Sequence, residues 1–210
     1  MFKLYALSLL AIAPVAAADS GWIDLLKSNS LKGWTRIAIP PDHPVKAQQQ
    51  WSVDNKTHTL HCSGDQGHEW LRYDARQFGN FEYHAEWRFD PVTTGVPKYN
   101  SGVFFRNDAD GRIWHQAQVN NGNGGYIFAD TMVNGELKRV NMSKQMKGKF
   151  EKPAGEWNVY DIRCESTHCT LTVNGQLSSE IDLEVARGYL GVESEGYHVT
   201  FRSLRARELP

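Results

Sequence analysis

The feature that most constrains the fold is a strict two-residue alternation in the run FEYHAEWRFD at 81–90. Successive side chains of a β-strand point to opposite faces, so this run has one apolar and one charged face. The apolar positions are predicted to point into a core between two sheets: Tyr83, Ala85, Trp87 and Phe89. The polar positions fall on the opposite face, which is either solvated or the wall of a polar groove: Glu82, His84, Glu86, Arg88 and Asp90.

The rest of the chain contains many short strand-like runs rich in β-branched and aromatic residues, separated by Gly, Asn, Asp and Pro. Such spacing predicts an all-β fold, a two-sheet antiparallel sandwich or jelly roll. Within it, VNGQ at 173–176 predicts a tight hairpin turn. Residues 130–156 are basic and show little periodicity, so we expect either a long loop that reaches over one sheet or an ordinary solvated loop.

The first 18 residues have the pattern of a secretory signal peptide, with Lys3, an apolar run and three alanines before Asp19. A membrane anchor is the alternative, but the apolar run is shorter than the roughly 20 residues that a span needs. Residues 19–210 are then predicted to form one exported domain, secreted or periplasmic. The chain has 23 basic and 24 acidic residues, so nothing in its charge calls for nucleic acid. No later stretch is predicted to span a membrane.

Three cysteines give a second indication of export. Cys164 and Cys169 flank ESTH between two strand-like runs, where opposed positions of a hairpin can form a disulfide. The alternative is two buried free thiols. Cys62 is predicted to lie in the core. No Cys/His spacing matches a zinc site.

A row of amides is the most distinctive polar feature. In WHQAQVNN at 114–121, Gln116, Gln118 and Asn120 share one strand face, while Ala117 and Val119 take the other together with His115. An amide both donates and accepts hydrogen bonds, which suits sugar hydroxyls, but it has no pKa useful to a base. Trp114 either stacks on a sugar ring or belongs to the core.

Several phrases occur together in an order that resembles the 3-keto-disaccharide hydrolase domain family. They include GWIDLLKSNSLKGW, EWLRYDARQFGNFEYHAEWRF, NSGVFFRN and GYLGVESEGYHVTFRSLRAREL, and the resemblance covers nearly all of 20–209. It implies a concanavalin A-like jelly roll of the lectin and glucanase type, export, and carbohydrate substrates. Active members of the family cleave glycosides already oxidised to a ketone at C3.

Such a ketone changes the catalytic groups that are needed. It acidifies the C2 proton, so one base, a group that stabilises the enolate and an acid near the leaving oxygen suffice. The paired carboxylates of ordinary glycosidases are then unnecessary.

The chain departs from the family's pattern at the expected groove. Gln116 stands where the family has Glu, and Asn121 stands where it has Asp, while Gln118 matches. In GVESEG, Glu193 takes the place of a Gln and Glu195 lies near the place of a His. One hypothesis is that the carboxylate has moved across the site from position 116 to position 193. The alternative is independent change in a homologue that only binds.

The remaining site residues are interpreted from parity and from the resemblance. Glu86 is expected to be a base or hydroxyl acceptor and Arg88 to hold or polarise oxygens, against the alternative of a cross-strand ion pair. Arg106 is expected to be a groove cation or a strand-end charge. His84 is a second candidate base or a structural histidine. We expect these residues to converge on one concave surface: Glu86, Arg88, Arg106, Gln116, Gln118 and Glu193.

The sequence therefore predicts an exported hydrolase or lyase that acts on 3-keto-glycosides, with an oligosaccharide or glycoside as its partner. Glu86, Arg88 and Glu193 are the catalytic candidates. The substrate-binding candidates are Arg106, Gln116, Gln118, Glu195, Trp114 and His84. A non-catalytic carbohydrate-binding module of the same fold is the alternative, and a structural domain of a surface assembly is the third. We expect no cofactor and no metal ligand cluster, although backbone oxygens can hold a structural Ca²⁺ without a motif.

Overall fold

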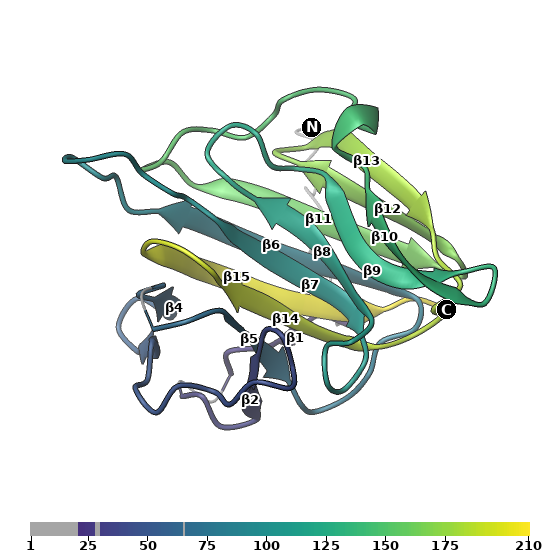
Figure 1. Ribbon diagram of the computed structural model, residues 1–210, viewed down its shortest axis with the longest axis horizontal. Helices are drawn as coiled ribbons and strands as arrows, with labels where there is room; N and C mark the ends of the chain where they lie inside the picture. The colour runs from purple at the N-terminus through teal and green to yellow at the C-terminus, as the bar shows by residue number, and fades with distance from the viewer. Residues whose placement is uncertain (1–20, 28–29, 65) are drawn as a thin grey trace, which may run out of the picture.

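Two antiparallel sheets stack face to face in the computed structural model, which describes residues 21–27, 30–64 and 66–210 (Figure 1). The predicted signal peptide lies outside the described residues. Within the described part of the chain, the only helical element is the short 3₁₀ turn η1 (Ser143–Gln145). The prediction of an all-β, two-sheet antiparallel sandwich is confirmed.

The eight-stranded sheet carries the alternating run at its centre. Its order is β13 (Gln176–Asp182), β12 (His168–Val173), β11 (Asn158–Glu165), β6 (Phe81–Phe89), β15 (Val199–Glu208), β4 (Thr59–Cys62) and β3 (Trp51–Asp54), with β1 (Ile23–Asp24) paired to β15. The order of the seven-stranded sheet is β10 (Glu136–Asn141), β9 (Ile127–Val133), β8 (Trp114–Val119), β7 (Ser101–Asn107), β14 (Tyr189–Ser194), β5 (Glu69–Tyr73) and β2 (Trp34–Ala38).

The core lies between the two sheets and is built by the predicted faces. Every apolar residue of the alternating run, from Tyr83 to Phe89, is at most 1% exposed, as expected. Trp87 packs edge-on against Tyr160 and Phe89. Ala117 and Val119 of β8 enter the same core. Because alternate residues of a strand face opposite ways, the amides of β8 lie on the outer face of the seven-stranded sheet.

The predicted disulfide between Cys164 and Cys169 is present. These residues lie directly opposite each other in the β11–β12 register. Cys62 belongs to the core cluster, as expected. The VNGQ hairpin also forms, between β12 and β13, with a positive φ at both Asn174 and Gly175.

The prediction of one long loop at 130–156 is wrong for its first half. Strand β9 continues to Val133, and β10 pairs with it from Glu136 to Asn141. The turn between them, Asn134–Gly135, has a positive φ at both residues, which is the geometry that Asn-Gly favours in hairpins. Every residue of β10 except Val140 is exposed, and charged residues lie on both of its faces. The sequence of β10 therefore lacks the alternation of apolar and polar residues that identifies a strand.

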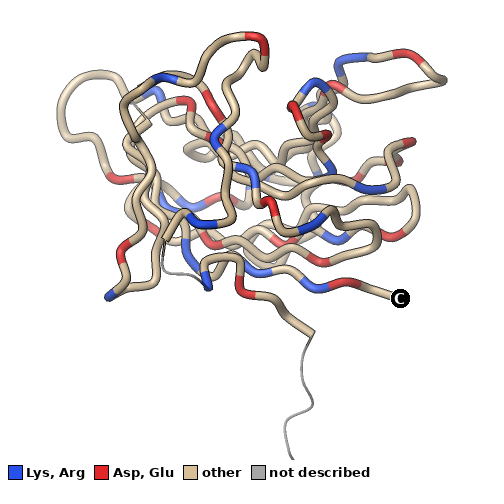
Figure 2. Tube along the Cα trace, turned by 90° about the horizontal axis from the view of Figure 1, so that it is seen from below, with Lys and Arg blue, Asp and Glu red and all other residues tan. Residues whose placement is uncertain are grey.

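Acidic and basic residues lie close to one another along many strands and turns (Figure 2). Among the described residues, no helix is long and apolar enough to cross a membrane.

Candidate functional site

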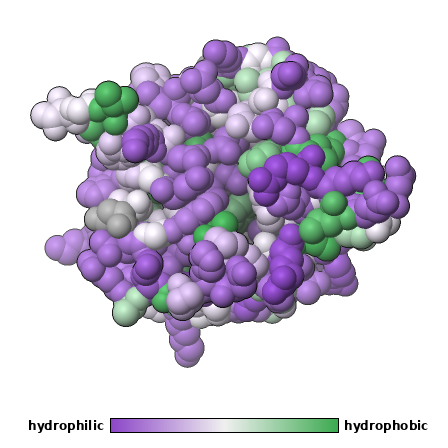
Figure 3. All heavy atoms as spheres, viewed as in Figure 1, coloured by the Kyte–Doolittle hydropathy of each residue, from purple (hydrophilic) through white to green (hydrophobic). Residues whose placement is uncertain are grey.

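A cavity of about 560 Å³ opens on the outer face of the seven-stranded sheet. This volume lies within the range of about 300–1,000 Å³ usual for small-molecule sites. The face seen in Figure 3 is largely hydrophilic, with hydrophobic patches between the polar side chains. One end of the cavity is polar and contains His68, Glu193 and Glu195; the other end is aromatic.

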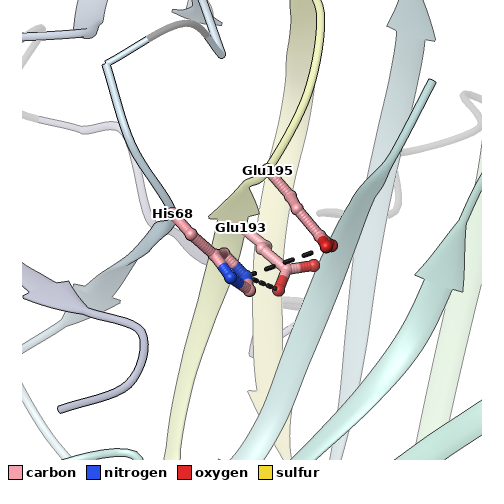
Figure 4. Close-up of side chains that lie close together, drawn as sticks. All are labelled: His68, Glu193 and Glu195. Carbon is pink, nitrogen blue, oxygen red and sulfur yellow. Dashed lines mark hydrogen bonds and ion pairs between the residues drawn. The ribbon is translucent and has the colours of Figure 1, made fainter. Parts of the chain in front are cut away.

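Glu193 of β14 is the central group of the polar end (Figure 4). It is only 3% exposed although it lines the cavity. One carboxylate oxygen, Oε1, is 2.8 Å from Nε2 of His68. The other, Oε2, accepts a 2.7 Å hydrogen bond from Nε2 of Gln116. A buried carboxylate is thus held between an imidazole and an amide, with both of its oxygens engaged.

Gly102 makes the contact between Gln116 and Glu193 possible. It lies on β7, the strand between β8, which carries Gln116, and β14, which carries Glu193. A Cβ at this position would lie 2.5 Å from both Cγ and Nε2 of Gln116. The missing side chain therefore lets Gln116 cross over β7 and reach the carboxylate.

The other amides continue this network along the cavity. Nε2 of Gln118 donates to Oδ1 of Asn100 at 2.6 Å, and Oε1 of Gln118 accepts from Gln116 at 3.2 Å. Both glutamines are nearly buried, and both line the cavity with Asn100. Held in this way, the amides form a fixed row of donors and acceptors at the height of the carboxylate.

Burial raises the pKa of Glu193 to about 7, and the nearby charge of Glu195 adds to the rise. The hydrogen bonds from His68 and Gln116 stabilise the carboxylate and offset part of this effect. For His68, burial alone would lower the pKa, but the hydrogen bond to Glu193 and the charges of Glu193 and Glu195 outweigh it and raise the pKa. Both shifts favour a proton on the pair near neutral pH.

Glu195 completes the group at the cavity mouth. Its side chain is 35% exposed, and Oε2 lies 3.9 Å from Nε2 of His68. The ligand atoms of His68, Glu193 and Glu195 lie within 4.8 Å of one another, close enough to share one cation. In the structure, His68 and Glu193 are instead hydrogen-bonded to each other.

Trp114 lines the cavity at its aromatic end. Its ring is 6.2 Å from that of Phe104 and 5.1 Å from that of Phe128, between ring centroids. His115 points the other way, as expected. Its Nε2 meets Oγ1 of Thr131 at 2.8 Å, and burial lowers its pKa to about 4, so it is a neutral structural histidine.

Residues 21–207 match the family model described as the 3-keto-alpha-glucoside-1,2-lyase-like domain. The chain belongs to this family. No curated protein matched the sequence of this lyase-like domain. The match spans both sheets and the whole cavity, so the resemblance recognised in the sequence is confirmed.

Solved structures share the fold of the lyase-like domain at low sequence identity. A Parabacteroides distasonis protein provisionally described as a glycosyl hydrolase is 14% identical, with a TM-score of 0.64 over 93% of this chain and 99% of its own. A carbohydrate-binding module from Bacillus subtilis is also 14% identical, with a TM-score of 0.60 over 84% and 96%. A β-glucanase from Bacillus licheniformis is 10% identical, with a TM-score of 0.51 over 92% and 95%.

The expected convergence of Glu86 and Arg88 with the amides is wrong, because β6 belongs to the other sheet of the lyase-like domain. Both residues lie on the outer face of the eight-stranded sheet. Glu86 accepts hydrogen bonds from Arg202 at 2.7 Å, and Arg88 stacks on Trp157 at 4.8 Å. Burial would raise the pKa of Glu86, but the contacts with Arg202 outweigh it and lower the pKa, which weakens this carboxylate as a base.

His84 lies on the same outer face and is likewise remote from the cavity. Its Nδ1 is 2.6 Å from Oδ1 of Asp161, the residue opposite it on β11. The sequence alternative of a structural histidine therefore describes its position better than that of a groove base.

Arg106 does not enter the cavity either, because a bulge turns it away. Its φ is +51°, and the β7–β14 register shifts between Tyr189 and Gly191. The buried guanidinium donates instead to the carbonyl oxygens of Gly79, Ser166 and Val185 at 2.8–3.1 Å. Burial lowers its pKa to about 10. Asn107, the next residue, lines the cavity in its place.

His68 is the residue that the sequence analysis missed. It lies in the loop just before β5, far from β14 in the sequence, and it is a lone histidine without a motif. Its contact with Glu193 spans 125 residues. The adjacent phrase EWLRYDARQF carries part of the family resemblance, but nothing in its spacing points to the histidine.

Proposed function

We propose that this domain is an enzyme that cleaves glycosides oxidised at C3, by proton abstraction at C2 and elimination of the group at C1. The observation that carries the proposal is Glu193: a nearly buried carboxylate in a ligand-sized cavity, whose pKa is about 7. A base with a pKa near the working pH is well suited to proton transfer. Perturbed carboxylates in cavities are common at catalytic sites, although ion-pair networks also produce them.

The proposed reaction uses groups at the polar end of the cavity. Glu193 takes the proton from C2, and the C–H electron pair becomes the C2–C3 double bond of an enolate. Protonated His68, next to Glu193, stabilises the negative oxygen at C3. The enolate then expels the oxygen at C1, which takes a proton from a water molecule at the cavity mouth. The amides of Gln116, Gln118 and Asn100 hold the sugar hydroxyls.

Addition of water to the C1–C2 double bond would complete a net hydrolysis. The elimination itself leaves one more proton at Glu193 and a hydroxide ion from that water. Glu193 can return its proton through His68, whose Nε2 lies 2.8 Å from Oε1 of Glu193. No cofactor is needed in this scheme.

A carbohydrate-binding module is the second candidate. The amide row favours it, because Gln116 and Gln118 bind hydroxyls without chemistry and Gln116 replaces the family's Glu. Against it, a binding module gains nothing from burying a carboxylate, which costs free energy unless the group is neutralised or paired.

We also propose an exported location, secreted or periplasmic. The first 18 residues have the pattern of a signal peptide, and an oxidising compartment would preserve the disulfide of Cys164 and Cys169. Alkylation of thiols in protein taken directly from the periplasm or the medium tests this. Labelling of Cys164 and Cys169 without prior reduction would contradict it.

The decisive experiment is incubation of the purified protein with 3-keto-trehalose and a 3-keto-glucoside, beside the unoxidised sugars. The expected result is release of reducing sugar or aglycone from the oxidised substrates alone. Each assay is run with and without EDTA, and activity is expected to survive the chelator. Binding without turnover would favour the module, and loss of activity with EDTA would assign His68, Glu193 and Glu195 to a metal.

A further inference from the structure

The aromatic end of the cavity is not used by the reaction proposed above. Trp114 precedes Gln116 by two residues on β8, a step of roughly 7 Å along the strand. Phe104 and Phe128 lie beside it on the neighbouring strands β7 and β9. A sugar ring held by the amides would therefore have its neighbouring group against these rings.

Two charged residues at this end, Arg139 and Asp130, neutralise each other. Nε of Arg139 donates to Oδ1 of Asp130 at 2.7 Å, across the β9–β10 pair. The guanidinium carbon lies 5.8 Å from the ring centre of Trp114 and 5.5 Å from that of Phe128. Arg139 thus extends the aromatic wall as a stacked plane, with its charge matched by Asp130.

Leu137 continues this wall to the rim. It shares a face of β10 with Arg139 and lines the cavity, yet it is 56% exposed. A single exposed leucine has no significance by itself. Here it adjoins an aromatic wall at the mouth of a cavity, where a bound apolar group would cover it.

From these observations we infer that the aromatic end is a leaving-group subsite for a planar aromatic ring, that is, a phenolic aglycone. This inference rests on the proposed function for the term leaving group. A second sugar fits less well, because its several hydroxyls need polar partners, whereas this end offers ring faces, Leu137 and an already paired Arg139.

The test compares C3-oxidised methyl, phenyl and 4-hydroxyphenyl glucosides with 3-keto-trehalose, in wild type and in Leu137→Asn. The variant is expected to lower kcat/KM for the two aryl substrates roughly tenfold, about 1.4 kcal/mol, and to leave the methyl substrate and 3-keto-trehalose unchanged. Because each substrate is compared between two proteins, differences in leaving-group acidity cancel. Leu177→Asn, an exposed leucine on β13 of the other sheet, is the matched control and should change nothing.

Equal losses for all four substrates, or a loss confined to 3-keto-trehalose, would overturn the inference. If the wild type turns over no substrate, the proposed function fails but the subsite can still be tested. Calorimetry with unoxidised methyl and phenyl glucosides then decides: tighter binding of the phenyl glucoside, lost in Leu137→Asn, supports the subsite. Equal affinities contradict it.

Discussion

The carboxylates on the two outer faces of this sandwich lie in opposite electrostatic environments. On the eight-stranded sheet, carboxylates such as Glu82 and Glu86 meet arginines from neighbouring strands, and the pKa of Glu86 is lowered. On the seven-stranded sheet, Glu193 is buried among amides with a partly exposed histidine beside it, and its pKa is raised. On the first face Glu82 and Glu86 are paired with arginines, and on the second Glu193 has no arginine or lysine partner among the described residues.

The density of charged residues along a strand is therefore a poor guide to the position of a functional site. In the alternating run, Glu82 and Glu86 pair with arginines of neighbouring strands, and such surface pairs contribute little free energy. A sparse row of amides leaves one carboxylate to be desolvated, which is what shifts its pKa towards neutrality. The four predictions below test this contrast between Glu193 and Glu86.

The largest effect is expected at the two carboxylates themselves. Glu193→Gln should lower kcat on a 3-keto-glucoside by about 10²–10⁴-fold, the usual cost of losing a general base. Glu86→Gln should change kcat less than about threefold, since it lies on the other sheet. Adding Gln116→Glu to Glu193→Gln should restore part of the rate, because the two side chains touch at 2.7 Å. Equal losses of kcat in Glu193→Gln and Glu86→Gln would contradict the different roles of the two carboxylates.

A smaller but specific loss is expected from Gly102→Ala. The new Cβ would overlap the side chain of Gln116 and push it off Glu193. We expect kcat/KM to fall about tenfold while the melting temperature changes little, since a flexible side chain can move aside. Gly79→Ala is the matched control, because its Cβ would meet only an ordinary contact at 3.9 Å. A large drop in thermal stability without a kinetic effect would contradict the role of Gly102.

The pH dependence should follow the environment of Glu193. The base must be ionised to accept a proton, so kcat/KM should rise as the pH increases through about 7. Glu195→Gln removes a like charge and should move this rise to lower pH, while His68→Gln removes a stabilising partner and should move it to higher pH. Glu86→Gln should leave the profile in place. Shifts in the same direction for the Glu195 and His68 variants would refute the arrangement.

The smallest effect is expected from stability measurements on the charge-rich face. Glu86→Gln breaks the pair with Arg202, and its cost in the free energy of unfolding should be about 0–1 kcal/mol, measured by urea denaturation. Arg202 keeps its stacking on Trp157, at 3.9 Å from the ring centre. A cost well above this range would mean that the outer face contributes to the fold as strongly as a buried network.

The alternation of residue types predicted on which side of its strand a side chain lies, but it could not predict which of the two sheets a strand joins. The parity of Trp87 and Gln116 is a local property, and both side chains point as expected. The pairing of β6 with β11 and β15 depends on residues more than 70 positions away, so Glu86 and Arg88 were assigned to the wrong surface. The resemblance to the family predicted the fold correctly, but it did not correct the assignment of Glu86 and Arg88.

The remaining misses have separate physical causes. A bulge turns Arg106 away from the face that parity gave it, and a left-handed backbone at one residue leaves no mark in a sequence of ordinary composition. His68 comes from a loop, where no period exists to orient a side chain. At 133–136 a hairpin turn was present in the letters VNGE, but the surrounding charges concealed the strands that it joins.

The bulge at Arg106 affects how the two sheets are expected to unfold. Arg106 belongs to the seven-stranded sheet. Among the residues that the structure describes, its guanidinium donates to carbonyl oxygens of the turn before β6, the disulfide-closed hairpin after β11 and the segment before β14. Removing any one of these carbonyls leaves a buried cation short of acceptors. The two sheets should therefore separate in a single cooperative transition rather than one after the other, with Arg106 acting as the joint that makes them one folding unit.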